Sequence, residues 1–110
     1  MISKKSTLTK KDFQKVIKQG KTYQNSSLLL KVLKTNKEVG GVGVAVAKNI
    51  TKKAVKRNYY KRVLRNILTE ILPDTFQVYY IVLIAQKNAE EKNFEELKKD
   101  AQQLIKKVSF

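Results

Sequence analysis

The chain has 110 residues, of which 24 are Lys or Arg and 9 are Asp or Glu, so its net charge is +15 at pH 7. It contains neither Cys nor His, which excludes disulfides, thiolate metal sites and a Cys or His nucleophile–base pair. The length suits one domain, residues 1–110. Because no segment resembles an export signal or reaches the ~20 apolar residues of a membrane span, we expect a cytoplasmic protein without membrane contact.

The positive charge is concentrated in the first two-thirds of the chain. Residues 1–37 carry a net charge of +9 and residues 38–69 carry +7, whereas residues 70–110 carry −1. Such a one-sided excess predicts a polyanionic partner, and nucleic acid is the usual one in the cytosol. A basic surface kept for solubility and an anionic membrane surface are the alternatives.

The first predicted element is a helix over residues 10–19. Thr9 and Asp12 have the spacing of a capping box, and Leu8 and Phe13 flank it in the positions of a hydrophobic staple. Gly20 follows as a helix-ending residue.

Two predicted strands follow, at residues 28–33 and 42–48. The first alternates between two faces, and the second has Val at 42, 44 and 46 on one face and the small residues Gly43, Ala45 and Ala47 on the other. Because turn residues separate the two strands, they are predicted to form a hairpin.

A long amphipathic helix is predicted from Thr51 to about Leu72, where Pro73 ends it. Its apolar side is predicted to hold Tyr59, Tyr60, Val63, Leu64, Ile67 and Ile71, and its opposite side Arg57, Asn58, Lys61, Arg62 and Arg65.

The last third of the chain predicts a strand and a helix. Residues 78–85 are apolar throughout, which indicates a central strand covered on both faces. Asn93 and Glu96 have capping-box spacing for a final helix. The predicted fold is α+β: an α/β sandwich with one mostly antiparallel sheet of about four strands and three helices, in the order helix, three strands, helix, strand, helix.

Catalytic groups are scarce. No Ser or Thr has an activating neighbour, the acidic residues do not form a converging carboxylate set, and Gly40-Gly41-Val42-Gly43 lacks the ending of a phosphate loop. We therefore expect no catalytic residue and no metal ligand in this chain.

The strongest functional signal is Lys48 to Arg65. Eight of these eighteen residues are Lys or Arg, none is acidic, and all three arginines of the chain lie here. Arginine offers a planar fork for bidentate phosphate contacts, and a merely solvated helix face would normally interleave Glu. This helix is predicted to bind a phosphate backbone.

The same residues carry a family resemblance. Ala54-Val55-Lys56-Arg57-Asn58-Tyr59-Tyr60-Lys61-Arg62-Val63-Leu64-Arg65 resembles the A-V-x-R-N-R-x-K-R-x-x-R signature of the bacterial ribonuclease P protein component. Residues 42–48 resemble its V-G-x-S-V-S-K strand, and Leu8, residues 12–17 and Gly20 its first helix. Residues 80–85 resemble its last strand, and Phe94 with Leu97 its final helix, so the match spans about residues 8–105.

The resemblance implies a strand–helix–strand crossover of the uncommon left-handed kind, where general rules favour a right-handed one. It also implies a protein that binds a catalytic RNA and helps remove the 5′ leader of precursor tRNA, with Mg²⁺ held by the RNA and no obligate protein partner. The residues implied to bind the RNA subunit are Lys48, Lys52, Lys53, Lys56, Arg57, Asn58, Lys61, Arg62 and Arg65. Those implied to line a cleft for the single-stranded leader are Phe13, Ile17, Lys31, Ala45 and Ala47. Phe13 fits stacking on the leader and the hydrophobic staple equally well.

Three residues depart from the family pattern. Tyr59 replaces the second arginine of the signature, and Ile17 and Lys31 stand where the family often has aromatic residues. We therefore expect leader binding to depend more on charge than on stacking. A structural ribosome-associated RNA-binding protein and a non-specific DNA-binding protein are the alternative functions.

Overall fold

The computed structural model describes residues 6–35, 40–47, 53–72 and 79–108. Lys48, Thr51, Lys52 and Pro73, which figure in the predictions, lie outside these residues. In chain order the elements are β1 (Ser6–Thr7), α1 (Lys10–Gln19), β2 (Lys21–Gln24), β3 (Leu28–Lys34), β4 (Gly41–Val46), α2 (Ala54–Ile71), β5 (Tyr79–Ala85), the 3-10 helix η2 (Lys87–Glu91) and α3 (Phe94–Lys106). The predicted α+β class is confirmed.

β5 is the central strand of the sheet, whose order is β1-β4-β5-β3-β2. It pairs in parallel with β4 and antiparallel with β3. Ile81 and Leu83 join the buried cluster on one face of the sheet, and Tyr80 and Val82 join the cluster on the other face. The prediction that this apolar strand is covered on both faces is confirmed.

The predicted hairpin between residues 28–33 and 42–48 is wrong. β3 and β4 lie on opposite sides of β5, so neither is hydrogen-bonded to the other. β3 pairs instead with β5 and with β2, in register from Lys21↔Val32 to Gln24↔Leu29. Turn residues predict that the chain reverses, but they do not decide which strands become neighbours. The wholly apolar β5 takes the position between β3 and β4, where helices can cover both of its faces.

Among the described residues the sheet is mixed rather than mostly antiparallel, with five strands where about four were predicted. The β1–β4 and β4–β5 pairs are parallel, and the other two are antiparallel. Two strands have no counterpart among the predicted residue ranges: β2, and β1, whose two residues pair with Gly41 and Val42. A strand this short has no periodicity from which to predict it. The left-handed crossover stays a prediction.

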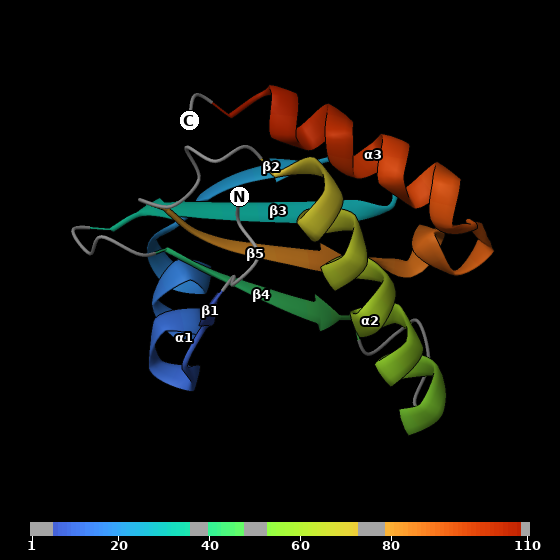
Figure 1. Cartoon of the computed structure of the whole chain (residues 1–110), viewed down its shortest axis with the longest axis horizontal. Helices are drawn as coiled ribbons and strands as arrows, with labels where there is room; N and C mark the ends of the chain where they lie inside the picture. Colours follow the sequence, from blue (N-terminus) through green and yellow to red (C-terminus); the bar gives the residue numbers. More distant parts are fainter. Residues whose placement is uncertain (1–5, 36–39, 48–52, 73–78, 109–110) are drawn as a thin grey trace.

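The helices lie on both faces of the sheet (Figure 1). α2 and α3 cover the face with the larger cluster, to which β3 contributes Leu28, Leu30 and Val32. α1 covers the other face, where Val16 packs with Tyr80 and Val82. Within the described residues, no helix combines the length and the apolarity needed to cross a membrane.

The ends of α1 and α3 follow local sequence signals. The Thr9 hydroxyl accepts a hydrogen bond from the backbone N–H of Asp12 at 3.1 Å. Asn93 and Glu96 form the predicted capping box, with bonds of 2.9 and 3.2 Å. Gly20 has extended rather than left-handed backbone angles, and a Cβ on it would lie 2.5 Å from the carbonyl oxygen of Val16. Close packing therefore explains the glycine.

The start of α2 differs from the prediction. The N-cap residue is Lys53, which makes no side-chain capping bond, so the helix begins two residues later than a cap at Thr51 would place it. Its end agrees with the prediction, since the helix stops at Ile71 with Leu72 as C-cap, directly before Pro73.

A polar network attaches α3 to the turn between β2 and β3. Ser27 is fully buried, and its hydroxyl donates a hydrogen bond to Oδ2 of Asp100 at 2.5 Å. Nζ of Lys92 lies 2.5 Å from the same oxygen, and the Asn25 amide donates to the backbone carbonyl of Asp100 at 2.9 Å. Burial raises the pKa of Asp100, but the hydrogen bonds from Lys92 and Ser27 and the charge of Lys92 together lower it by more, so the net shift is downward.

Candidate nucleic-acid interface

α2 separates an apolar side from a basic side. The side chains that it buries are Tyr60, Val63, Leu64, Ile67 and Leu68. The predicted apolar side is right at Tyr60, Val63, Leu64 and Ile67. Ile71 is only partly buried, Tyr59 is exposed, and Leu68, which was not predicted, is buried. Tyr59 lies at the border of the apolar side and is 49% exposed.

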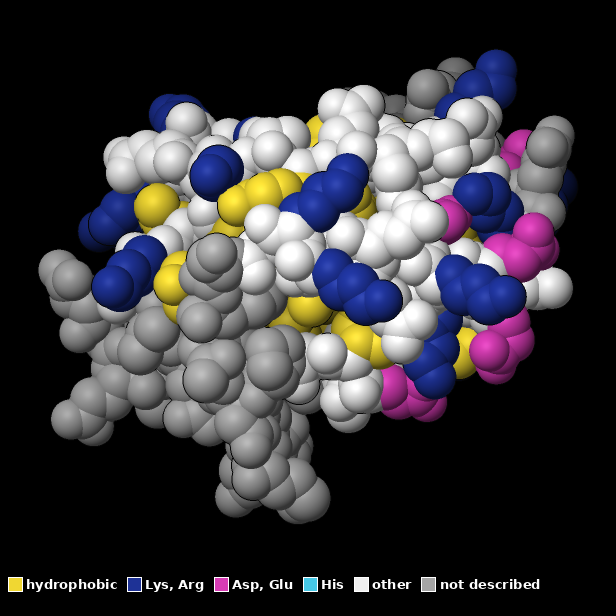
Figure 2. Space-filling view, turned by 90° about the horizontal axis from the view of Figure 1, so that it is seen from above, with side chains coloured by type: hydrophobic (Ala, Val, Ile, Leu, Met, Phe, Trp, Pro, Cys, Tyr) yellow, Lys and Arg dark blue, Asp and Glu magenta, His cyan; other side chains and the backbone are white. Residues whose placement is uncertain are grey.

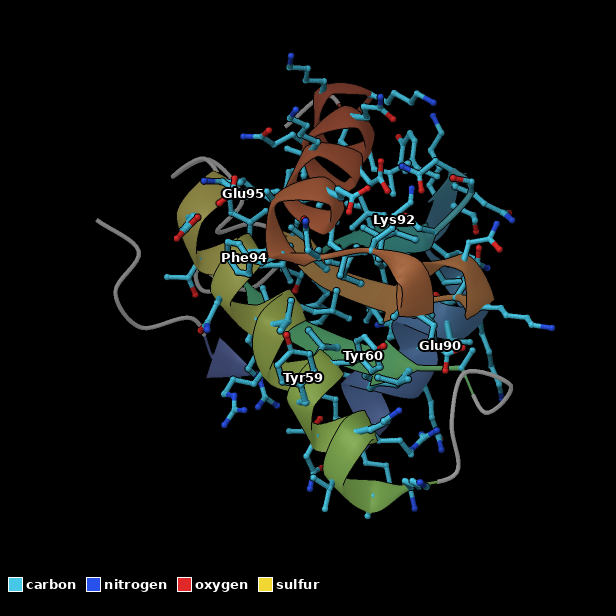
Figure 3. All side chains as sticks on the ribbon, turned by 90° about the vertical axis from the view of Figure 1, so that its right-hand side faces the viewer. Tyr59, Tyr60, Glu90, Lys92, Phe94 and Glu95 are labelled. Atoms are coloured by element: carbon cyan, nitrogen blue, oxygen red, sulfur yellow. The ribbon has the colours of Figure 1, made fainter. Side chains whose placement is uncertain are left out.

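The basic side faces solvent. Lys53, Lys56, Asn58, Arg62 and Arg65 are exposed, and Arg57 and Lys61 are partly buried. Arg57 precedes the buried Tyr60 by three residues, so it lies in line with the buried side and not opposite to it as predicted. The N-terminal turns of α2 extend past β4 toward the side of the sheet that α1 covers (Figures 1 and 3). The described residues that were predicted to bind RNA thus lie on α2 and its N-cap residue, Lys53. They surround the helix rather than share one side, because Lys56 and Arg65 are separated by about two and a half turns. We call this set the basic surface of α2.

Acidic side chains are gathered elsewhere. In the described part of the chain, α2 carries one acid, Glu70, in its last turn, where it pairs with Lys98 at 2.8 Å. The hydrogen bond to Glu70 and its charge raise the pKa of Lys98. Figure 2 shows the acidic side chains of that face toward one end of the molecule, where η2 and the start of α3 lie. Arg62 and Arg65 have no acidic partner among the described residues.

Two adjacent tyrosines of α2 have different surroundings. Tyr60 is buried, and its hydroxyl donates to the backbone carbonyl of Glu90 at 3.4 Å. Desolvation, followed by the charges of Glu90 and Tyr59, raises the pKa of Tyr60. The exposed ring of Tyr59 meets that of Tyr60 edge to face, and the guanidinium carbon of Arg62 lies 5.9 Å from its centre. Figure 3 shows both rings on α2, with Glu90 beyond Tyr60.

The small residues of β4 allow α1 to approach the sheet closely. A Cβ on Gly43 would lie 2.9 Å from Cδ2 of Phe13 and 3.5 Å from Cδ1 of Leu8. Phe13 and Leu8 thus pack over the same backbone position, as the staple predicts. Phe13 is only partly buried, so a part of its ring remains accessible beside the sheet.

Beyond Phe13, two rows of residues cross the sheet on the side that α1 covers. Lys31 and Gly43 pair with Val82 of β5 from either side, and Leu29 and Ala45 pair in the same way with Ile84. Lys31, Leu29, Ala45 and Ile84 are partly buried, as is Ile17 of α1. Four of the five predicted cleft residues, namely Phe13, Ile17, Lys31 and Ala45, therefore share this side of the sheet.

Ala47 is the exception. It follows the last residue of β4 and packs against the larger cluster on the other side of the sheet. Leu29 and Ile84 were not predicted, because strand alternation identifies them only once the register with β5 is known. Lys31 donates a hydrogen bond to the Thr22 hydroxyl at 2.8 Å, which holds its ammonium group near β2.

A separate hollow of about 530 Å³ lies between α1 and the ends of β3 and β5. Its lining includes Lys11, Lys15 and Lys34 with Asp12 and Tyr80, and none of the predicted cleft residues. Lysines from the first third of the chain therefore also gather at this hollow, which is separate from the predicted leader cleft.

The sequence is similar to proteins of one family. The family model described as Ribonuclease P matches residues 1–109. The ribonuclease P protein component of Clostridioides difficile (strain 630) is 33% identical over 104 residues, which cover 90% of this chain and 87% of that protein. That of Pseudanabaena sp. (strain PCC 6903) is 33% identical over 100 residues, covering 90% and 86%.

Solved structures of RNase P proteins have a similar fold. The RNase P protein from Thermotoga maritima superimposes with a TM-score of 0.80 at 24% identity, covering 97% of this chain and 100% of that one. The Staphylococcus aureus RNase P protein gives a TM-score of 0.79 at 20% identity, with 94% of each chain covered. At this identity the two structures bear on the fold alone.

Proposed function

The chain belongs to the ribonuclease P protein family, and we propose that it binds the RNA subunit through the basic surface of α2 and the 5′ leader of precursor tRNA beside α1. As a member, it is the protein subunit of ribonuclease P and has the RNA subunit as its partner. The ribosome-associated alternative is not favoured by these similarities.

The observation that carries the proposal is the exposure of the basic surface of α2, a helix whose one acid, Glu70, lies in its last turn. Arg62 and Arg65 are exposed without an acidic partner among the described residues. Their charge is thus available to phosphates, and each phosphate contact releases counterions from the RNA. Lys48 and Lys52, which lie outside the described residues, belong to the same proposal.

The proposed leader site is supported by the side of the sheet next to α1. Phe13 offers a partly exposed ring, and the partly buried Leu29, Ala45 and Ile84 form an apolar floor beside it. Unpaired bases stack on aromatic rings, whereas paired bases in a duplex do not present their faces. Lys31 adds a positive charge at the border of this floor.

We assign the bond-breaking step and its Mg²⁺ to the RNA subunit. Three acids of the described residues have partners within the fold: Glu70 with Lys98, Glu96 with the cap of α3, and Asp100 with Lys92 and Ser27. Within those residues, no three His, Cys, Asp or Glu side chains are grouped as a metal site. The contribution of the protein is then to neutralise phosphates and position the substrate. A cytoplasmic location is part of this proposal.

Reconstitution tests the proposal. A bacterial ribonuclease P RNA transcript, a precursor tRNA with a 5′ leader and the purified protein are combined at low Mg²⁺. We expect leader removal only when RNA subunit and protein are both present. Cleavage by the protein free of RNA would contradict catalysis by the RNA, and an RNA subunit that the protein does not assist would contradict the subunit role.

An Ala45→Leu variant in the same assay tests the leader site. The larger side chain fills the apolar floor, so we expect weaker binding of precursor tRNA with unchanged affinity for the RNA subunit. A loss of affinity that is equal for precursor and mature tRNA would contradict leader binding at this position.

A further inference from the structure

In the part of the chain that the structure describes, large exposed apolar side chains are rare and lie together. Among the described residues the large hydrophobic side chains that are exposed are Val55, at 82%, and Tyr59, at 49%. They are four residues apart on α2, so they are neighbours on adjacent turns. Both lie on α2 among the residues of its basic surface. An apolar pair in the middle of a cationic surface needs an explanation other than the fold, because neither side chain belongs to the buried cluster.

The ring of Tyr59 is held in place from inside the protein. Tyr60 meets it edge to face, with ring centres 5.6 Å apart, and Tyr60 is itself anchored by burial and by its bond to the Glu90 carbonyl. Arg62 lies near the ring at 5.9 Å from its centre. Because these contacts limit the motion of the ring, little conformational entropy is lost when a flat partner stacks on it.

The charge around the ring limits the choice of partner. A second copy of the chain would bring another net charge of +15 and is repelled. The partner must supply negative charge for Arg62 and a flat apolar face for Tyr59. An unpaired nucleotide has both within one unit, since its phosphate meets the guanidinium while its base stacks on the ring.

We propose that Val55, Tyr59 and Arg62 form a stacking platform for one unpaired base of the RNA subunit. This rests on the proposed function, in which α2 binds that RNA. The platform adds a requirement that phosphate contacts alone do not impose: the RNA must present a base that is out of its helix at this point. Tyr59 is then a specificity-determining residue of the interface.

The test compares three Tyr59 variants in binding to a bacterial ribonuclease P RNA transcript. We expect Tyr59→Phe to bind within about twofold of the wild type, because the ring is kept, and Tyr59→Leu to bind about tenfold more weakly. The salt dependence of binding should be unchanged in both, because no phosphate contact is lost. Circular dichroism and a thermal melt verify folding, and Tyr59→Gln replaces Tyr59→Leu if the latter is unfolded.

A second readout locates the base. Chemical probing of base reactivity in the RNA should show an unpaired base that wild-type protein and Tyr59→Phe protect and Tyr59→Leu leaves reactive. Wild-type affinity of Tyr59→Leu would overturn the platform, as would a loss of affinity without such a base, which would indicate an altered helix surface.

Arg65→Ala separates the two proposals. It removes a phosphate-binding group one turn away from the platform, so it should weaken binding and lower the salt dependence. If Arg65→Ala weakens binding and Tyr59→Leu does not, only the platform is wrong. If neither variant changes binding, the proposed interface itself is wrong. If Tyr59→Leu instead abolishes binding of an acidic protein partner and leaves RNA binding intact, the platform is overturned in favour of a protein contact.

Discussion

α2 and α3 pack on the same face of the sheet, but their charged residues are arranged differently. α3 and the residues before it interleave both signs, and their charges meet partners inside the chain: Lys92 with Asp100, and Lys98 with Glu70. Its first turn carries Glu95 and Glu96, where acids stabilise the positive end of a helix. α2 has no acid in its first turn and no side-chain cap.

The difference indicates what each helix contributes. α3 follows the rules for a stable helix, and its residues Lys98 and Asp100 have partners of opposite charge within the protein. α2 departs from those rules, since its N-terminal half gathers cations at the end where the helix dipole disfavours them. Such a departure is expected at a binding surface, where a partner supplies the missing negative charge. α3 is thus a stability element, and α2 combines a buried stability side with an exposed binding side.

The largest expected loss of stability comes from a change on the buried side of α3. Leu97 is 1% exposed, so Leu97→Ala should lower the free energy of unfolding by about 2–5 kcal/mol through lost burial and the cavity left behind. Val55→Ala is the matched control on α2, because that side chain is 82% exposed and its truncation should leave the free energy of unfolding almost unchanged. Urea unfolding measures both. Equal effects of the two changes would contradict the distinction between buried and exposed apolar groups.

A smaller loss of stability is expected when the polar network between α3 and the β2–β3 turn is disrupted. Asp100→Asn removes the charge that Lys92 and Ser27 stabilise, and should cost about 1–3 kcal/mol of unfolding free energy at neutral pH. Because the pKa of Asp100 is lowered from 3.8 in the folded protein, the ionised form stabilises the fold. That stabilisation is complete above pH 3.8 and is lost as the pH falls through the lower pKa of the folded state.

Unfolding between pH 5 and pH 2 tests this dependence on the charge of Asp100. The wild type should lose stability toward acid more steeply than Asp100→Asn, so the two curves converge at the lowest pH. Gln103→Ala is the control: it changes an exposed neutral residue of the same helix, and it should keep the steepness of the wild type. Curves that stay parallel for Asp100→Asn would contradict the role of its charge.

Local signals in the sequence predicted the elements that depend on local contacts. α1 and the capping box of α3 are determined by neighbouring residues, and β5 is recognised from an apolar run that suits burial on both faces. Strand neighbours depend on the whole chain instead. The turn residues before β4 could not show that β5 inserts between β3 and β4, and β1 is too short to have a pattern.

The candidate site was predictable to a similar degree. The basic side of α2 follows from helical spacing and from the absence of acids, which are properties of one segment. The exposure of Tyr59 was missed because it lies at the border of the apolar side, where the packing of Tyr60 and Leu68 decides which residue is buried. Predicting Leu29 and Ile84 would have required the register between β3 and β5. Predicting that Ala47 packs on the other side of the sheet would have required the residue at which β4 ends.

The smallest expected change is in the free energy of RNA binding when one charge is removed, and it tests the difference between α2 and α3 most directly. Arg65→Ala on α2 and Lys99→Ala on α3 each remove one exposed positive charge, so they change the net charge of the protein equally. If the charge of the protein as a whole attracted the RNA, both would weaken binding to the same small extent. If the basic surface of α2 contacts phosphates, only Arg65→Ala should lower the slope of log affinity against log salt, by about 0.7–0.9 for the lost contact. Titrations of the RNA subunit at several salt concentrations distinguish the two outcomes. Equal slopes for the two variants would assign the attraction to net charge and remove the special role of α2.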